Sequence, residues 1–131
     1  MNRINVLLDE IKSISNQDGD ILCVFQFGSH VQGKSNKSSD MDVCLVLNID
    51  NYSPLMLSQK KLEYLKRFPG VDIQIFQQLP LYIKVRILKH GIIILCKDED
   101  KIYDLAFSVI TEYGDYVHIY REYLKEIENA M

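Results

Sequence analysis

An apolar run, residues 21–27, passes directly into Gly28 and Ser29, and this junction narrows the possible folds more than any other part of the chain. A short apolar run that is bounded by glycine is typical of a buried strand ending in a tight turn. Gly28 can adopt backbone angles closed to other residues and lets a phosphate approach the main chain. Ser29 adds a hydroxyl and an N–H at the predicted start of a helical turn, where unpaired amides favour anions. The sequence therefore predicts a phosphate-binding turn after the first strand.

Two carboxylates, Asp40 and Asp42, stand at the start of a second apolar run, residues 43–47. Because side chains alternate along a strand, both carboxylates are expected on one face. Two adjacent carboxylates repel each other unless a cation lies between them, and hard oxygen ligands of this kind suit magnesium. The spacing thus predicts a magnesium site close to the phosphate-binding turn.

A third carboxylate, Asp72, interrupts the apolar run of residues 71–76. A strand has little reason to tolerate a charge there unless the charge has a function, although an Asp on the wet face of a sheet, beside Gln74, is the alternative. If the second and third strands are neighbours in register, Asp40, Asp42 and Asp72 come within reach of one metal pair.

The segment from Phe27 to Asp42 resembles the signature of the minimal nucleotidyltransferase (MNT) domains, in the DNA polymerase beta-like nucleotidyltransferase superfamily. The resemblance rests on Gly28, Ser29, Gly33 and the two aspartates at this spacing. It continues at residues 70–76 and 87–95, so that it covers about residues 1–97. It implies an α+β nucleotidyltransferase fold, with a mixed four-stranded sheet, helices packed on one face and a long C-terminal helix.

The resemblance also implies an enzyme that moves AMP from ATP to a hydroxyl acceptor with the help of Mg²⁺, in a site that suits two ions. Asp40 and Asp42 would hold the metal. Asp72 would be a third metal ligand, the group that takes or orients the acceptor's proton, or both. Gly28, Ser29 and Gly33 would bind the nucleotide.

MNT proteins with a short core and a C-terminal helix are commonly paired with HEPN ribonuclease toxins, which are all-helical, and several transfer AMP to a toxin tyrosine. The implied function is therefore that of an antitoxin acting by AMPylation. Two alternatives stay open: a small-molecule nucleotidyltransferase of the aminoglycoside-modifying type, and a non-catalytic antitoxin that only binds its toxin. Polymerase or tRNA-tailing activity would need further domains that 131 residues do not supply.

The composition fits one soluble domain, residues 1–131, with a catalytic core over 1–97 and a helical extension over 98–131. The apolar fraction of 47% is ordinary, and a net charge of −3 gives no electrostatic case for stable binding of nucleic acid. No apolar run reaches membrane-spanning length and no signal peptide precedes Asn2, so we expect a cytoplasmic protein with no membrane partner.

Periodicity and turn residues predict the elements of the core. Ser53 is the expected cap of a helix that begins with Pro54 and ends at about Arg67. Pro80 is expected to open a later helix, which Gly91 ends. The predicted helices cover residues 3–15, 54–67 and 80–90, and the predicted strands cover 21–27, 41–48, 71–76 and 92–96.

A last helix is predicted from about residue 98 to 129, and it carries a wide stripe rich in tyrosine. The stripe either packs on the chain's own sheet or serves as the surface of a homodimer or partner complex. Gly114 is expected to weaken or bend this helix.

Three cysteines and three basic residues complete the candidates. The cysteines, Cys23, Cys44 and Cys96, lie in predicted strands without disulfide or metal spacing, and we expect them to be buried. The basic residues, Lys84, Arg86 and Lys89, form either a solvated helix face or a contact for a triphosphate or an acidic partner.

Overall fold

The structure is a computed structural model, and it describes residues 3–28 and 41–130. The first half of the chain forms α1 (Arg3–Gln17), β1 (Ile21–Phe27), β2 (Met41–Leu47) and α2 (Pro54–Arg67). The second half forms β3 (Val71–Ile75), the 3₁₀ turn η1 (Phe76–Gln78), α3 (Leu81–His90), β4 (Ile92–Cys96) and α4 (Glu99–Ala130). The predicted strands and helices are therefore present, with bounds that differ by one or two residues.

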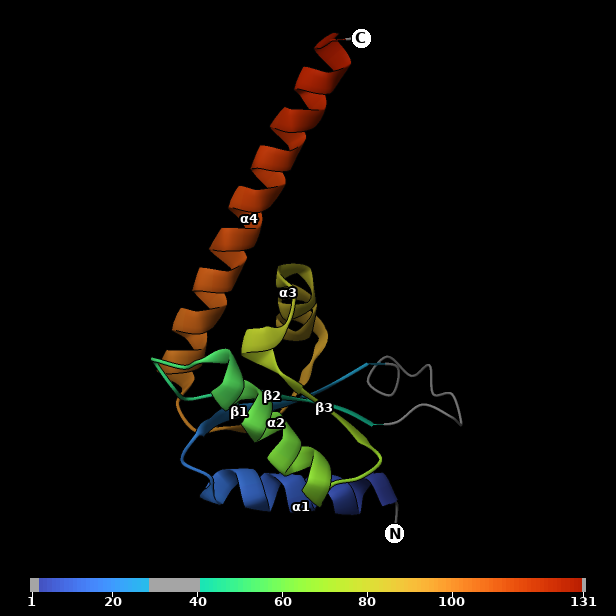
Figure 1. Cartoon of the computed structure of the whole chain (residues 1–131), viewed down its shortest axis with the longest axis vertical. Helices are drawn as coiled ribbons and strands as arrows, with labels where there is room; N and C mark the ends of the chain where they lie inside the picture. Colours follow the sequence, from blue (N-terminus) through green and yellow to red (C-terminus); the bar gives the residue numbers. More distant parts are fainter. Residues whose placement is uncertain (1–2, 29–40, 131) are drawn as a thin grey trace.

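The described strands form one mixed sheet in the order β3-β2-β1-β4. β1 lies at its centre, antiparallel to both β2 and β4, whereas β2 runs parallel to β3. The parallel pair needs a crossover, which α2 provides. This topology places the end of β1 beside the starts of β2 and β3, at one end of the strands (Figure 1).

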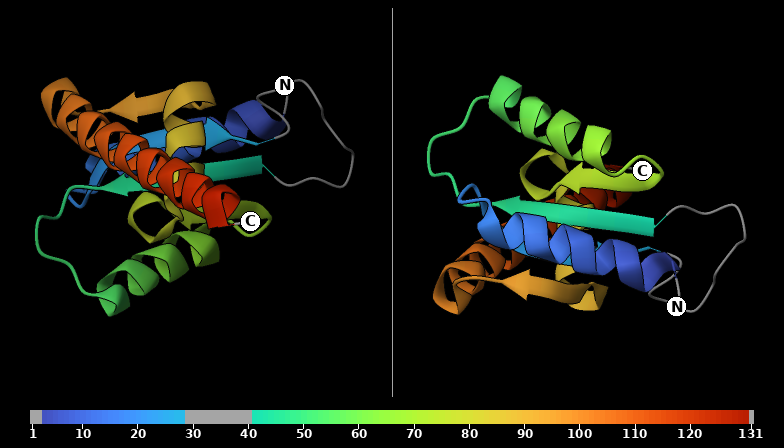
Figure 2. Two further views of the ribbon diagram at one scale, coloured as in Figure 1. Left: turned by 90° about the horizontal axis from the view of Figure 1, so that it is seen from above. Right: turned by 90° about the horizontal axis from the view of Figure 1, so that it is seen from below.

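Helices cover both faces of the sheet, which corrects the expectation that they pack on one face only. One apolar cluster lies under α1 and α2, and it includes Ile11, Leu57 and the β2 residues Val43 and Leu45. The second cluster lies on the opposite face with α3 and α4. Figure 2 shows the two pairs of helices from opposite sides of the sheet. The α+β class and the four-stranded mixed sheet are as predicted.

Capping and side-chain contacts fix α2 against the sheet. The Ser53 hydroxyl accepts a hydrogen bond from the Met56 N–H at 3.2 Å, as expected for an N-cap. Deeper in the fold, Asp18 accepts hydrogen bonds from the Tyr64 hydroxyl at 2.9 Å and from Lys60 Nζ at 3.0 Å. Because Asp18 precedes β1 while Tyr64 and Lys60 belong to α2, this cluster ties the helix to the first strand.

Two of the three cysteines meet across the sheet. Cys23 and Cys96 are partners in the β1–β4 register, and their sulfur atoms lie 3.0 Å apart. Cys23 and Cys44 are buried as expected, whereas Cys96 is only half-buried. Burial is the main cause that raises the pKa of the Cys23 and Cys44 thiols, and the neighbouring Cys96 raises that of Cys23 further. Both groups are therefore neutral thiols near pH 7.

α4 is one continuous helix that runs through Gly114 without interruption. Its first part contacts the body of the protein through Ile102 and Val109, which are buried against α3 and the sheet. Its second part extends away from the body (Figure 1). Across the described ranges, none of the helices has the length and apolar character that crossing a lipid bilayer requires.

Candidate active site

Asp42 and Asp72 lie side by side near the first residues of β2 and β3. They are direct partners in the parallel register of the two strands, so both side chains stand on the same face of the sheet. Asp42 is half-buried and Asp72 is exposed. Asp42 is also the partner of Phe27, the last residue of β1. The structure therefore brings these two carboxylates together with the end of the first strand, as the sequence predicts.

Gly28 follows β1 and lies directly against Asp42. Its φ of +94° is in the left-handed region that side-chain-bearing residues seldom occupy. A β-carbon at this position would overlap Oδ2 of Asp42 and lie 2.9 Å from its Cγ. Both the backbone angle and the approach of the carboxylate therefore require glycine here.

A chain of hydrogen bonds holds Asp72 from the side. Gln74 Nε2 donates to Asp72 Oδ1 at 3.0 Å, and Lys61 Nζ donates to Gln74 Oε1 at 3.4 Å. Because an ammonium group only donates, it fixes the orientation of the Gln74 amide, which must then present its N–H to Asp72. Sequence reasoning placed Gln74 on the same face as Asp72 but did not find Lys61, which comes from α2.

Three of the predicted site residues, Ser29, Gly33 and Asp40, lie outside the described residues. In residues 3–28 and 41–130, no three His, Cys, Asp or Glu side chains gather as a metal-binding group. The donor set that is described, the pair Asp42 and Asp72, nevertheless fits magnesium, since both ligands are hard oxygens and their charges face each other across neighbouring strands.

The basic residues of α3 divide into two kinds. Lys84 Nζ lies 5.7 Å from the centre of the Phe76 ring, a cation–π contact that ties α3 to η1, the turn after β3. Arg86 and Lys89 are exposed to solvent. Lys84 thus has a structural partner, whereas the side chains of Arg86 and Lys89 are open to solvent or to a ligand.

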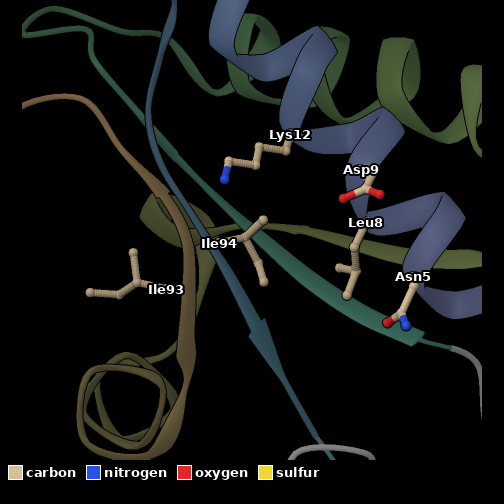
Figure 3. A pocket seen from close by; sticks show the side chains of 6 residues that line it. All are labelled: Asn5, Leu8, Asp9, Lys12, Ile93 and Ile94. Atoms are coloured by element: carbon tan, nitrogen blue, oxygen red, sulfur yellow. The ribbon is translucent and has the colours of Figure 1, made fainter.

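A pocket of about 450 Å³ lies elsewhere, between α1 and β4 (Figure 3). From α1 it is lined by Asn5, Leu8, Asp9 and Lys12, and from β4 by Ile93 and Ile94. The pocket belongs to the β4 edge of the sheet, whereas Asp72 lies on β3 at the opposite edge. It is therefore separate from the carboxylate pair.

The fold and the carboxylate pair define a nucleotidyltransferase-type domain, and comparison with known families agrees. The family described as "Polymerase beta, Nucleotidyltransferase" matches residues 9–100 of this chain. The chain belongs to this polymerase beta nucleotidyltransferase family, which confirms the resemblance seen in the sequence.

Individual relatives are similar over different lengths. A putative protein adenylyltransferase of Methanocaldococcus jannaschii is 37% identical over 68 residues, which are 51% of this chain and 49% of that protein. This chain thus spans about half the length of the curated relative it matches.

Two solved structures share the fold. A toxin–antitoxin crystal structure with AMP-PNP matches at a TM-score of 0.65 and 16% identity, over 91% of this chain and 98% of that one. A tri-AMPylated Shewanella oneidensis HEPN toxin in complex with its MNT antitoxin matches at a TM-score of 0.61 and 12% identity, over 92% and 96%. At these identities the similarity is one of fold.

Proposed function

We propose that this chain is a magnesium-dependent adenylyltransferase that moves AMP from ATP to a tyrosine hydroxyl of a HEPN toxin and so acts as the toxin's antitoxin. The observation that carries the proposal is the side-by-side placement of Asp42 and Asp72 next to the turn at Gly28. Further support comes from the nucleotidyltransferase family, from the adenylyltransferase relative, and from the fold shared with an MNT antitoxin bound to an AMPylated HEPN toxin.

In the proposed reaction the acceptor's hydroxyl oxygen forms a bond to the α-phosphorus of ATP. The bond from this phosphorus to the oxygen bridging to the β-phosphate breaks, and pyrophosphate leaves with that electron pair. The hydroxyl proton passes to the carboxylate of Asp72. Phosphoryl-type transfer depends mainly on positioning and on the neutralisation of charge, so the arrangement of these carboxylates is the main contribution of the protein.

Asp40 and Asp42 would hold the metal, with Asp72 as the proposed third ligand. Bound magnesium would neutralise negative charge on the triphosphate oxygens. Asp72 can serve both as ligand and as proton acceptor because a carboxylate has two oxygens. The Gln74 amide donates to Asp72 Oδ1, which keeps a second lone pair, so both oxygens stay available for these two roles.

Gly28 lies directly against the Asp42 carboxylate, and because it has no side chain it would leave the main chain of the turn accessible to a phosphate. Ser29 and Gly33 are proposed to bind phosphate beside it, as the family signature implies. ATP would thus lie beside this turn and next to the carboxylates.

The proposal is tested with the purified chain, a HEPN protein encoded by the neighbouring gene, and ATP that carries a radioactive α-phosphate. We expect magnesium-dependent transfer of label to a toxin tyrosine, located by mass spectrometry, and its loss in Asp42→Asn and Asp72→Asn. Asp50→Asn, which removes an exposed carboxylate beyond β2, is the matched control. If Asp42→Asn neutralises the toxin as well as the wild type does, the chain acts by binding alone. Labelling of an aminoglycoside but not of the toxin would favour the small-molecule alternative, and a gene neighbourhood without a HEPN protein would count against the partner.

A further inference from the structure

The distal half of α4, residues 112–130, carries an apolar stripe that the described part of the chain does not cover. Tyr116, Tyr120 and Tyr123 are 58%, 52% and 58% exposed. Ile119, Leu124 and Ile127 are 65%, 41% and 40% exposed. Aromatic and aliphatic side chains at this exposure form a patch of the kind that marks an interaction site on a soluble protein.

The stripe repeats every seven residues, which is the spacing of a helix that packs along another helix. One row runs through Ile102, Val109, Tyr116 and Tyr123, and the other through Ala106, Tyr113, Tyr120 and Ile127. The first members, Ile102 and Val109, are buried, so the start of the seam is filled by the chain's own body. Tyr113 still packs on the same core cluster, whereas the seam residues from Tyr116 onward are exposed in the described part of the chain.

Apolar residues also flank this seam, at Val117, Ile119 and Leu124. A two-stranded coiled coil carries charged residues at such flanking positions, whereas a wide apolar face is typical of a helix packed into a bundle. The expected occupant is therefore a helical protein that presents more than one helix.

Charge argues against a second copy of this chain as the occupant. Residues 112–130 contain five carboxylates and two basic side chains, a formal net charge of −3. The whole chain also has a net charge of −3, so the remainder is formally neutral. Two such helices would repel each other, whereas a partner with a basic rim would be attracted.

We propose that the distal half of α4 is the docking surface for a helical partner protein with a basic rim. This inference rests on the proposed function, in which the partner is the HEPN toxin. Tyr116 and Tyr120 are its proposed centre, since their rings already stack on each other, with centroids 6.3 Å apart and an interplanar angle of 11°. Preordered aromatic side chains lose little entropy on binding, which is typical of the residues that dominate an interface.

The test is calorimetry of the toxin against the wild-type chain and against Tyr116→Ser/Tyr120→Ser, with magnesium–ATP binding to this chain measured in parallel. We expect the double substitution to weaken toxin binding by about thirtyfold or more and to leave ATP binding unchanged. The matched control, Tyr52→Ser/Tyr82→Ser, removes two tyrosines of the body with similar exposure, 45% and 57%. A charge variant, Glu112→Lys/Glu126→Lys, should also weaken toxin binding, and the loss should be larger at low salt than at high salt.

The outcomes are distinguishable. Equal toxin binding by the wild type and the tyrosine variant would overturn the docking surface and leave the proposed function intact. Failure of the wild type to bind the toxin at all would overturn the proposed partner, and the inference with it. Sedimentation that shows a wild-type dimer and a monomeric tyrosine variant would assign the stripe to a second copy instead.

Discussion

Gly28 and the carboxylate of Asp42 are so close that no side chain fits between them. Gly28→Ala should therefore destabilise the protein by about 1–3 kcal/mol, because it adds left-handed backbone strain to the overlap with Asp42. It should also weaken ATP binding. Gly70 has a similar φ of +90° but nothing within 4 Å of its added β-carbon, so Gly70→Ala isolates the strain. Urea unfolding of both variants measures the difference, and equal losses would show that the contact with Asp42 is unimportant.

Binding of ATP should depend on magnesium through Asp42. Replacing the carboxylate in Asp42→Asn keeps the shape of the side chain but removes the charge that would hold the cation. We expect calorimetry to show at least about tenfold weaker binding of magnesium–ATP, whereas ATP without metal should bind alike to both proteins. If the wild type binds ATP equally well with and without magnesium, the carboxylate pair does not hold a metal.

Gln74 should act as a positioning residue for Asp72. Gln74→Leu removes the N–H that holds Oδ1, so transfer should slow by about tenfold while the KM for ATP changes little. Gln78→Leu serves as the control, since Gln78 donates to Ser58 and not to a site carboxylate. Single-turnover rates would separate this effect from binding, and an unchanged rate in Gln74→Leu would remove Gln74 from the site.

Asp18 should contribute stability that depends on pH. Burial alone would raise its pKa, but hydrogen bonds from Lys60, the Asp20 N–H and Tyr64 outweigh it, so the pKa is lowered in the folded state. A lowered carboxyl pKa gives stability that is fully present above the unfolded value of about 3.9. This stability is lost as the pH falls through the folded pKa.

Asp18→Asn tests this contribution. The variant should be less stable than the wild type by about 1–3 kcal/mol at pH 7, and the difference should shrink below about pH 4. Asp9→Asn, an exposed carboxylate on α1, is the control. Urea unfolding as a function of pH provides the measurement. A difference between wild type and Asp18→Asn that stays constant down to pH 2.5 would contradict the ionic role of Asp18.

The strands could be predicted because each apolar run is bounded by residues that stop it, such as Gly28 and the Pro69–Gly70 pair. The placement of the helices was harder. In β2, Val43 and Leu45 face one cluster while Cys44 and Val46 face the other, so both faces are buried. Such a continuous apolar run is typical of a strand that is covered on both faces. It therefore indicated helices on both sides of the sheet, and not on one side as we expected.

The carboxylate pair was predictable for a similar reason. Period two along each strand, combined with adjacent strands, places Asp42 beside Asp72. The role of Lys61 was not predictable, because its contact with Gln74 depends on how α2 crosses beside β3. Such a contact produces no periodic pattern in the sequence. The meeting of Cys23 with Cys96 depends likewise on a pairing between distant strands.

The central position of β1 has a consequence for the order in which the protein can fold. β1 leaves the ribosome well before β4, which is one of its two neighbours in the sheet and ends at Cys96. A nascent chain can pair β1 with β2 early, but it must keep the other edge of β1 unsatisfied until β4 has been synthesised. Such long-range pairing slows folding and leaves an open strand edge in the meantime. We therefore expect incomplete chains that end before residue 92 to be held by chaperones or degraded.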